Sequence, residues 1–405
     1  MTRLPVPDVA DAAGRVRQPP PTARRTPLVA LAPADPFAPG TFSGLSHRLF
    51  DELVRQGWDV TSFATRDLRW HDLARGAVRP RAALRRATAD RRTPVVDPDW
   101  AWSQRGFERL SARLARRLAA IPVEVPVLQV GTQVDASGGR PGRPVHCITD
   151  CTVVQALAAD EFAVSRASSA VQHEAVACQR RVFAGCRRVL TLSEWTRRSV
   201  IDDYGIAPER VEVVGAGANL PAPLPRRTDP ARPTVLFVGR DWHQKGGPLL
   251  LDAFRLVRRL RPAARLVVVG CHPPLDDEPG VEVVGVLDRS RPTGDTRLRA
   301  LYASATCLAL LSRFDAFPNV LLEAGAAGVP VVSTHEGSRA EAVVDGTTGL
   351  LVATRTPEAV ADALLAVIDH PERADAMGRT AARRVAARFT WPVVAARVAQ
   401  AVGGS

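Results

Sequence analysis

The chain has 405 residues, of which 46% are hydrophobic and 24% charged, and this length predicts a globular protein of about two domains. No window approaches the ~20 consecutive apolar residues of a membrane-spanning helix, and no charged-then-apolar leader opens the chain, so we expect a cytoplasmic protein. The formal net charge of +12 indicates an anionic partner, but no zinc finger, RNP signature or basic region feeding heptads occurs, so we do not expect nucleic acid.

The chain is predicted to open with a disordered lead-in, because residues 1–26 are rich in Pro, Arg and Ala and lack apolar periodicity. Residues 27–218 then repeat one pattern, in which a β-branched run ends in a small-residue turn and leads into an amphipathic helix. Such a βαβ series predicts a mostly parallel sheet with helices on both faces. The first helix is expected at 45–57, and strands are expected at 27–33, 58–63, 125–131, 145–149, 189–193 and 211–217.

A basic tract runs from Arg66 to Arg92. One interpretation is a solvated helical face. The other is a patch against an anionic membrane surface, where each basic residue adds about 1 kcal/mol. The second interpretation places the protein peripherally at the inner face of the membrane.

The pattern breaks after the segment GAGANL, residues 215–220. This segment begins like a dinucleotide-binding fingerprint, but its sixth residue is Leu220 and a proline-rich stretch follows where a helix should begin. We therefore interpret it as a hinge. Residues 219–233, which contain five prolines, are predicted to be an interdomain linker.

The second half, residues 234–388, restarts the alternation of strands and helices. Its first helix is expected at about 248–260, and strands are expected at 234–239, 265–270, 281–285, 307–312, 329–334 and 349–352. The fold class is therefore α/β, with two doubly wound Rossmann-like domains facing across a cleft. A ligand is expected between the carboxyl ends of their strands.

The segment GRDWHQKGG, residues 239–247, holds Lys245, the single lysine among 54 basic residues. It follows a strand and leads into a helix, and its glycines let a backbone approach an anion closely. An ammonium is a compact point charge, whereas a guanidinium is a planar fork that fits less easily beside packed phosphates. We interpret Lys245 as a phosphate contact; the competing interpretation is one accidental lysine.

Two carboxylates occur in the segment FDAFPNVLLEAGAAGVPVVST, residues 314–334. Asp315 precedes a helix expected to begin near Val320, and Glu323 is expected on the first turn of that helix. Such carboxylates suit the vicinal hydroxyls of a sugar or ribose. The alternative is compensation of the helix dipole, which contributes under ~1 kcal/mol each and would be preferred for these two residues alone.

The sequence lacks the motifs of several other enzyme classes. It has no Walker loop, GxSxG or HExxH, so hydrolase and nucleoside triphosphatase functions are not expected. The six cysteines show no CxxC or Cys/His zinc spacing, and we expect neither a metal site nor a bound cofactor.

Taken together, these segments resemble the retaining glycosyltransferases of family 4, which have the GT-B fold. The resemblance is strong over residues 234–400, through VLFVGRDWHQKGGPLLLDAF, ARLVVVG, the segment LYASATCLALLSRFDAFPNVLLEAGAAGVPVVSTHEGSRAEAVVDGTTGLLV and the tail ARFTWPVVAARV. It extends to the first half through ADPFAPGTFSGLSHRLFDEL and LTLSEWTRRSVIDDYGIAPERVEVVGAGAN.

The resemblance implies a metal-independent enzyme whose second domain binds a UDP- or GDP-linked sugar and whose first domain binds an acceptor. Arg240 and Lys245 would hold the diphosphate and neutralise charge on the leaving group. Asp315 would lie at the donor sugar, and Glu323 would accept hydrogen bonds from the ribose. The other donor-binding residues that the resemblance implies are Gly44 in the first-domain loop, Val286 and Leu287 beside the base, and the backbone of Phe317, Pro318, Asn319 and Val320. Residues 389–405 would form a helix that crosses back to the first domain.

Two positions depart from the family pattern. The family has Glu at the position of Asp315, which is one methylene shorter. It often has a histidine in the first domain near the reacting sugar, and the corresponding region here is HCITDCT, residues 146–152. Asp150 is the preferred catalytic candidate in that region and His146 the second; a structural role is the alternative for both.

The resemblance predicts a hexosyltransferase-like enzyme that moves a sugar from a nucleotide-diphosphate sugar to an acceptor with retention. Lipid-linked, protein and small-molecule acceptors all remain open. The alternatives are a non-catalytic sugar-nucleotide-binding protein and a sugar-nucleotide 2-epimerase.

Overall fold

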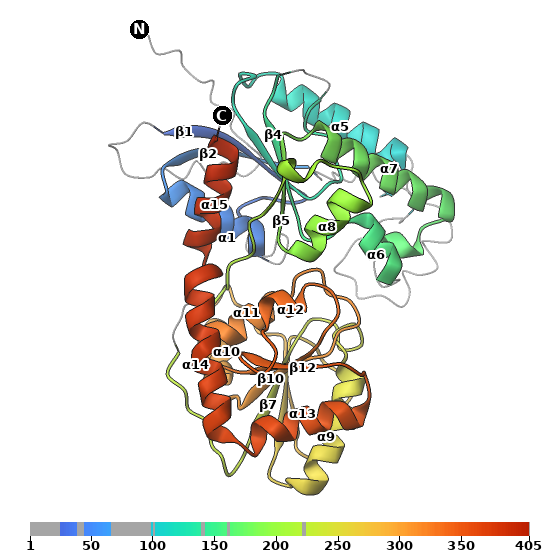
Figure 1. The fold of residues 1–405 in the computed structure, drawn as a ribbon. Coiled ribbons are helices and arrows are strands. Elements are labelled where there is room, and N and C mark those ends of the chain that lie inside the picture. The colour runs from blue at the N-terminus through green and yellow to red at the C-terminus, as the bar shows by residue number, and fades with distance from the viewer. Residues whose placement is uncertain are drawn as a thin grey trace.

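The computed structural model describes residues 25–38, 44–65, 99, 102–138, 142–159, 163–220 and 224–404. Two α/β domains follow one another along the chain and are stacked in Figure 1. Almost all of the predicted lead-in, and the whole tract from Arg66 to Arg92, lie outside the described residues. Within the described part, no helix combines the length and the apolar character needed to cross a bilayer.

The first domain is built on a parallel six-stranded sheet of order β2-β1-β3-β4-β5-β6. Its central strands are buried along their whole length, which is typical of a parallel sheet covered on both faces. The predicted strands are present as β1 (Thr26–Ala32), β2 (Trp58–Ala64), β3 (Val127–Val130), β4 (Val145–Thr149), β5 (Arg188–Thr191) and β6 (Val211–Val213). The helices are α1 (Leu45–Arg55), α5 (Gln104–Leu118), α6 (Val153–Ala159), α7 (Ser169–Gly185) and α8 (Glu194–Asp202).

The second domain has a parallel six-stranded sheet of order β12-β11-β10-β7-β8-β9. The predicted strands are present as β7 (Thr234–Val238), β8 (Arg265–Val269), β9 (Val281–Gly285), β10 (Cys307–Leu310), β11 (Val331–Thr334) and β12 (Gly349–Val352). The helices are α9 (Gly247–Leu260), α10 (Pro292–Ser304), α11 (Asn319–Ala326), α12 (Arg339–Ala342), α13 (Pro357–Ile368) and α14 (Pro371–Arg388). The prediction of two doubly wound α/β domains is confirmed.

The strand order of the second sheet defines where a ligand can lie. The chain builds β7, β8 and β9 towards one edge and then returns to add β10, β11 and β12 towards the other. The loops after β7 and β10 therefore diverge to opposite sides, and in sheets of this kind ligands bind at such a switch point, beyond the carboxyl ends of the strands.

The chain crosses between the domains twice. After α14 it enters the last helix, α15 (Trp391–Gly403), which packs against α1 of the first domain (Figure 1). Val394 and Val398 of α15 share an apolar core with Leu49 of α1. At the other crossing, a Cβ on Gly217 would lie 2.5 Å from the ring of Trp391, so only glycine fits there.

Candidate active site

Lys245 and Asp315 form an ion pair at the switch point of the second sheet. Their Nζ and Oδ2 atoms lie 2.5 Å apart, and the side chains are 23% and 13% exposed. Lys245 belongs to the turn between β7 and α9, and Asp315 follows β10. The sheet therefore brings together two groups that are 70 residues apart in sequence.

The turn that carries Lys245 is held in place by close backbone contacts. Gly246 has φ +78°, and a Cβ at this position would lie 2.1 Å from the carbonyl oxygen of Leu311. The amide of Leu311 in turn donates to the carbonyl of Lys245 at 3.3 Å. Glycine is required both by the left-handed conformation and by this approach.

Asp150 faces the same place from the first domain, directly after β4. Burial, together with the negative charge of Asp315, raises the pKa of Asp150 to about 6, although the amides of Asp150 and Cys151 act in the opposite direction. The hydroxyl of Thr196 donates to the carbonyl of Asp150 at 2.6 Å. Three predicted catalytic residues, Lys245, Asp315 and Asp150, therefore converge between the domains.

His146 lies elsewhere, which corrects its place as the second candidate in that region. It is the second residue of β4, whereas the cleft is at the carboxyl end of that strand. The side chain is fully buried, and neither ring nitrogen has a hydrogen-bond partner in the described part of the chain. Burial, and then the charges of Arg187 and Arg188, lower its pKa to about 4. His146 is therefore a neutral histidine within the sheet.

Glu323 is buried in α11 and already has two partners. Its Oε1 accepts from Nη1 of Arg289 at 2.8 Å, and its Oε2 accepts from the hydroxyl of Tyr302 at 3.1 Å. The helix begins at Asn319, so Glu323 is its fifth residue and lies beyond the first turn where we expected it. Because dipole effects fade within one turn, compensation of the helix dipole does not explain this carboxylate.

Sequence reasoning missed Arg289 and Tyr302. Burial lowers the pKa of Arg289, but the carboxylate of Glu323, with Tyr302 and Asp295, more than offsets this and raises it overall. Burial and the charge of Glu323 raise the pKa of Tyr302. The position of Arg289, two residues after Leu287 in the segment expected beside the base, is the signal that could have identified it.

The other predicted donor-binding residues lie in segments that follow strands of the second sheet, except Gly44, which precedes α1 of the first domain. Arg240 is exposed, and Val286 is 67% exposed at the end of β9. Gly44, with φ +85°, begins α1 of the first domain. Leu287, in the loop after β9, is half-buried. At the start of α11, Phe317 and Pro318 are buried, and Asn319 and Val320 are half-buried.

Several buried polar atoms at this edge lack a hydrogen-bond partner among the described residues. They are Oγ of Ser312, Oδ1 of Asn319 and Nη1 of Arg339. Arg339 is fully buried, and its guanidinium donates to the carbonyl of Thr334, the last residue of β11, to the carbonyl of Arg313, which follows β10, and to the carboxylate of Glu336. Buried polar groups normally have partners, so these three atoms leave unused hydrogen-bonding capacity in this part of the second domain. The described residues contain no cluster of three potential metal ligands.

Comparison with known proteins finds a similarity that covers most of the second domain. Residues 232–370 match the family model described as Glycosyl transferases group 1. The D-inositol 3-phosphate glycosyltransferase of Kineococcus radiotolerans is 34% identical over 248 residues, which cover 54% of this chain and 57% of the relative. A glycogen synthase of Mycobacterium tuberculosis is 32% identical over 186 residues, covering 43% and 42%. The chain thus spans about half the length of the curated relatives it matches.

Solved structures share the whole two-domain fold at low sequence identity. The sucrose-phosphate synthase of Thermosynechococcus elongatus has a TM-score of 0.67 at 17% identity, covering 93% of this chain and 98% of that one. Anabaena HepE, in complex with UDP and glucose, has a TM-score of 0.62 at 17% identity, covering 93% and 99%. The second domain, which carries Lys245, Asp315 and Glu323, therefore matches the group 1 glycosyl transferases over residues 232–370.

Proposed function

We propose that the protein is a glycosyltransferase of family 4 that moves a sugar from a UDP- or GDP-linked donor to an acceptor, with retention at the anomeric carbon. One observation carries this proposal: Lys245 and Asp315 pair at the switch point of the matched domain, opposite Asp150 of the other domain. A cation and two carboxylates converge there on a cleft between two domains, which is the usual place for a ligand in such folds.

Lys245 and Arg240 would bind the diphosphate of the donor. During transfer the bond between the anomeric carbon and the diphosphate oxygen breaks, and negative charge grows on the leaving group. The ammonium of Lys245 would stabilise that charge without a metal ion. The acceptor hydroxyl would attack on the face that the phosphate leaves, and its proton would pass to the departing phosphate oxygen.

Asp315 would exchange its partner when the donor binds. In the structure it pairs with Lys245. A diphosphate beside Lys245 would compete for the ammonium and leave the Asp315 carboxylate to accept hydrogen bonds from sugar hydroxyls. Asp315 is one methylene shorter than the Glu of the family pattern, so the sugar would lie closer to the backbone here.

Glu323 can accept ribose hydroxyls while it keeps its present partners. Each carboxylate oxygen has two lone pairs, and Arg289 and Tyr302 occupy one on each. The donor would bind beside Arg289 at the end of β9, with Val286 and Leu287 against the base. Structures of Anabaena HepE contain UDP or UDP-glucose, which supports testing uridine donors first.

The test is calorimetric titration with UDP, GDP, ADP and their sugar nucleotides, on the wild type and on Lys245→Ala. Micromolar binding of one nucleotide diphosphate that the variant loses would support the proposal, and no binding at all would contradict it. Product analysis then separates the alternatives. Transfer or slow hydrolysis frees the nucleotide diphosphate, a 2-epimerase returns an altered sugar nucleotide, and a non-catalytic binder changes nothing.

The acceptor is proposed to bind the first domain and to be lipid-linked, protein or small. Contact with an anionic membrane through the tract from Arg66 to Arg92 would favour a lipid-linked acceptor. Co-sedimentation with vesicles that contain phosphatidylserine tests this part: binding that weakens with salt supports it, and binding that is absent or insensitive to salt contradicts it.

A further inference from the structure

Glu341 of the second domain caps a helix of the first domain. Its Oε2 accepts from the backbone amide of Glu194 at 2.7 Å, and its Oε1 accepts from the amide of Trp195 at 2.9 Å. These are the first two residues of α8, whose amides have no partner within the helix. The third amide, that of Thr196, is taken by Ser193 of the same domain at 3.0 Å.

This contact is strong because of its charge and geometry. A carboxylate at a helix N-terminus accepts charge-assisted hydrogen bonds and also meets the positive end of the helix dipole. Beside it, the rings of Trp195 and Phe314 pack edge to face, with centroids 5.7 Å apart. We call Glu341, Phe314 and the first two residues of α8 the clasp.

Both sides of the clasp continue directly into the proposed catalytic carboxylates. On the first domain, Thr196 follows Trp195 and donates through its hydroxyl to the carbonyl of Asp150 at 2.6 Å. On the second domain, Phe314 immediately precedes Asp315. The clasp therefore connects the two carboxylate-bearing segments across the cleft through one or two residues on each side.

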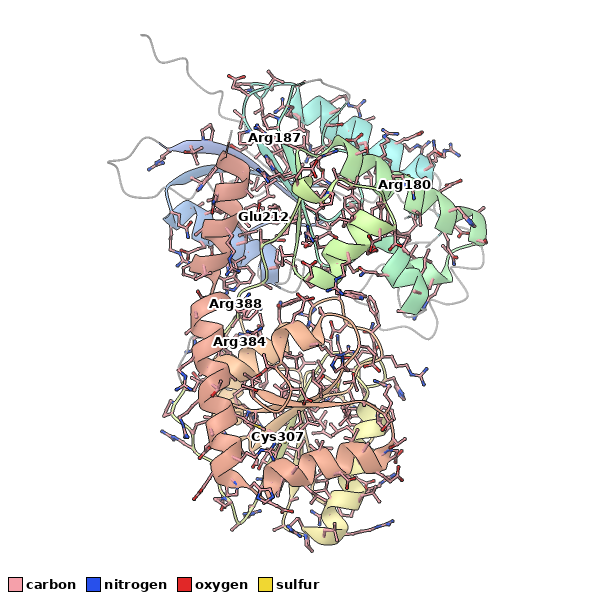
Figure 2. All side chains as sticks on the ribbon, in the orientation of Figure 1. Arg180, Arg187, Glu212, Cys307, Arg384 and Arg388 are labelled. Carbon is pink, nitrogen blue, oxygen red and sulfur yellow. The ribbon has the colours of Figure 1, made fainter. Side chains whose placement is uncertain are left out.

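The second-domain side of the clasp is fixed from behind. The guanidinium of Arg384 donates to the carbonyl of Glu341 at 2.8 Å, and the hydroxyl of Ser338 donates to the carbonyl of Ala316, next to Asp315, at 2.7 Å. Figure 2 shows Arg384 on α14, below Arg388, which lies nearer the first domain. Since α14 leads into the crossing to α15, Glu341 is anchored to the same helix that carries the chain back to the first domain.

We propose that Glu341 is a positioning residue, and that the clasp sets the distance between Asp150 and Asp315 by holding the two domains closed. Its effect on turnover rests on the proposed function, whereas its effect on domain closure does not. Opening the domains would return two helix amides to water and separate the Trp195 and Phe314 rings. Closure is then favoured by an ionised side chain that touches no substrate.

The test compares Glu341→Gln with the wild type in two measurements. Glutamine has the size of glutamate but only one accepting oxygen. Its NH₂ group is a donor, so it cannot accept from the second backbone amide. In hydrogen exchange resolved to single residues, we expect the amides of Glu194 and Trp195 to exchange about tenfold faster, as loss of one charge-assisted bond implies, while Thr196 keeps its protection. We expect kcat to fall by a similar factor, with the KM for the sugar nucleotide within about twofold.

Two further variants make the experiment decisive. Glu372→Gln, the same change at an exposed position on the first turn of α14, should alter neither measurement. Trp195→Leu weakens the clasp from the other domain and should lower kcat even if Glu341→Gln folds poorly.

Unchanged protection in Glu341→Gln, or lost protection with unchanged kcat, would each overturn the proposal. If the wild type turns over no sugar nucleotide, the transferase proposal fails. Exchange at the two amides then decides by itself whether the clasp closes the domains.

Discussion

The ammonium of Lys245 lies 2.5 Å from a carboxylate oxygen of Asp315, across the switch point of the second sheet. Both side chains are half-buried, and each belongs to a segment that follows a strand of the second sheet. The pair holds an ammonium and a carboxylate side by side at the edge where the donor is proposed to bind. Such preorganisation avoids the cost of ordering these groups when the donor binds.

Replacing Lys245 should impair turnover far more than folding. Lys245→Ala removes the proposed leaving-group contact, and by the scale of one lost oxyanion donor it should cost about 3 kcal/mol of transition-state stabilisation. Lys245→Arg keeps the charge but replaces a compact ammonium by a planar guanidinium. Its kcat/KM should therefore lie between those of the wild type and Lys245→Ala. Steady-state kinetics on the three proteins check this order. Equal rates in Lys245→Ala and the wild type would remove the assigned role.

Replacing Arg289 should destabilise the second domain. Arg289→Ala leaves the 4%-exposed carboxylate of Glu323 without its cation, and breaking a buried pair costs 3–5 kcal/mol, here reduced to about 2 kcal/mol because Arg289 is one-third exposed. Arg291→Ala, on the same loop and 78% exposed, is the matched control and should stay near the wild type. Urea unfolding compares the three. Similar losses in both variants would show that the Glu323 pair contributes little.

The fold was predictable from the sequence because its signal is local. The strands from 27–33 to 349–352 are short apolar runs ended by turn residues, and each is present in the structure. The convergence of Lys245 with Asp315 follows from strand order alone, since both follow neighbouring strands of a parallel sheet. The contacts of Arg289 with Glu323 and of Glu341 with α8 could not be predicted. They depend on contacts between side chains and backbone groups of different loops or domains, and the apolar periodicity of the sequence does not indicate such contacts.

His146 shows where the predicted strand bounds are informative. The segment HCITDCT offers His146 and Asp150 as polar candidates, and composition does not distinguish them. Strand register does: β4 runs from Val145 to Thr149, so His146 lies inside the sheet and Asp150 follows its carboxyl end. The strand predicted from the sequence, 145–149, has the observed bounds, so it already placed His146 inside the strand and Asp150 directly after it.

Asp150 should make stability depend on pH in a defined direction. Its pKa is raised from 3.8 to about 6 by burial and by Asp315, so the folded state favours the protonated carboxyl. The stability that comes from this favoured protonation is fully present below the pKa of the unfolded state, 3.8. It is lost as the pH rises through the pKa of the folded state, about 6. The unfolding free energy of Asp150→Asn relative to the wild type should therefore increase by on the order of 3 kcal/mol between those limits. Urea titrations across that range, with exposed Asp276→Asn as control, measure it. A constant difference would contradict the raised pKa.

Substituting Gly246 should separate the cost of backbone strain from the cost of a clash. In Gly246→Ala the new Cβ meets the carbonyl oxygen of Leu311 at 2.1 Å, at φ +78°. Gly346→Ala has a similar φ, +68°, but nothing lies within 4 Å of its Cβ, so it should cost only the left-handed strain of about 1 kcal/mol. Thermal unfolding should show a clearly larger loss for Gly246→Ala. Because this turn carries Lys245, calorimetry should also show weaker nucleotide binding by that variant alone. Equal effects of the two substitutions would mean that the turn relaxes around the added methyl group.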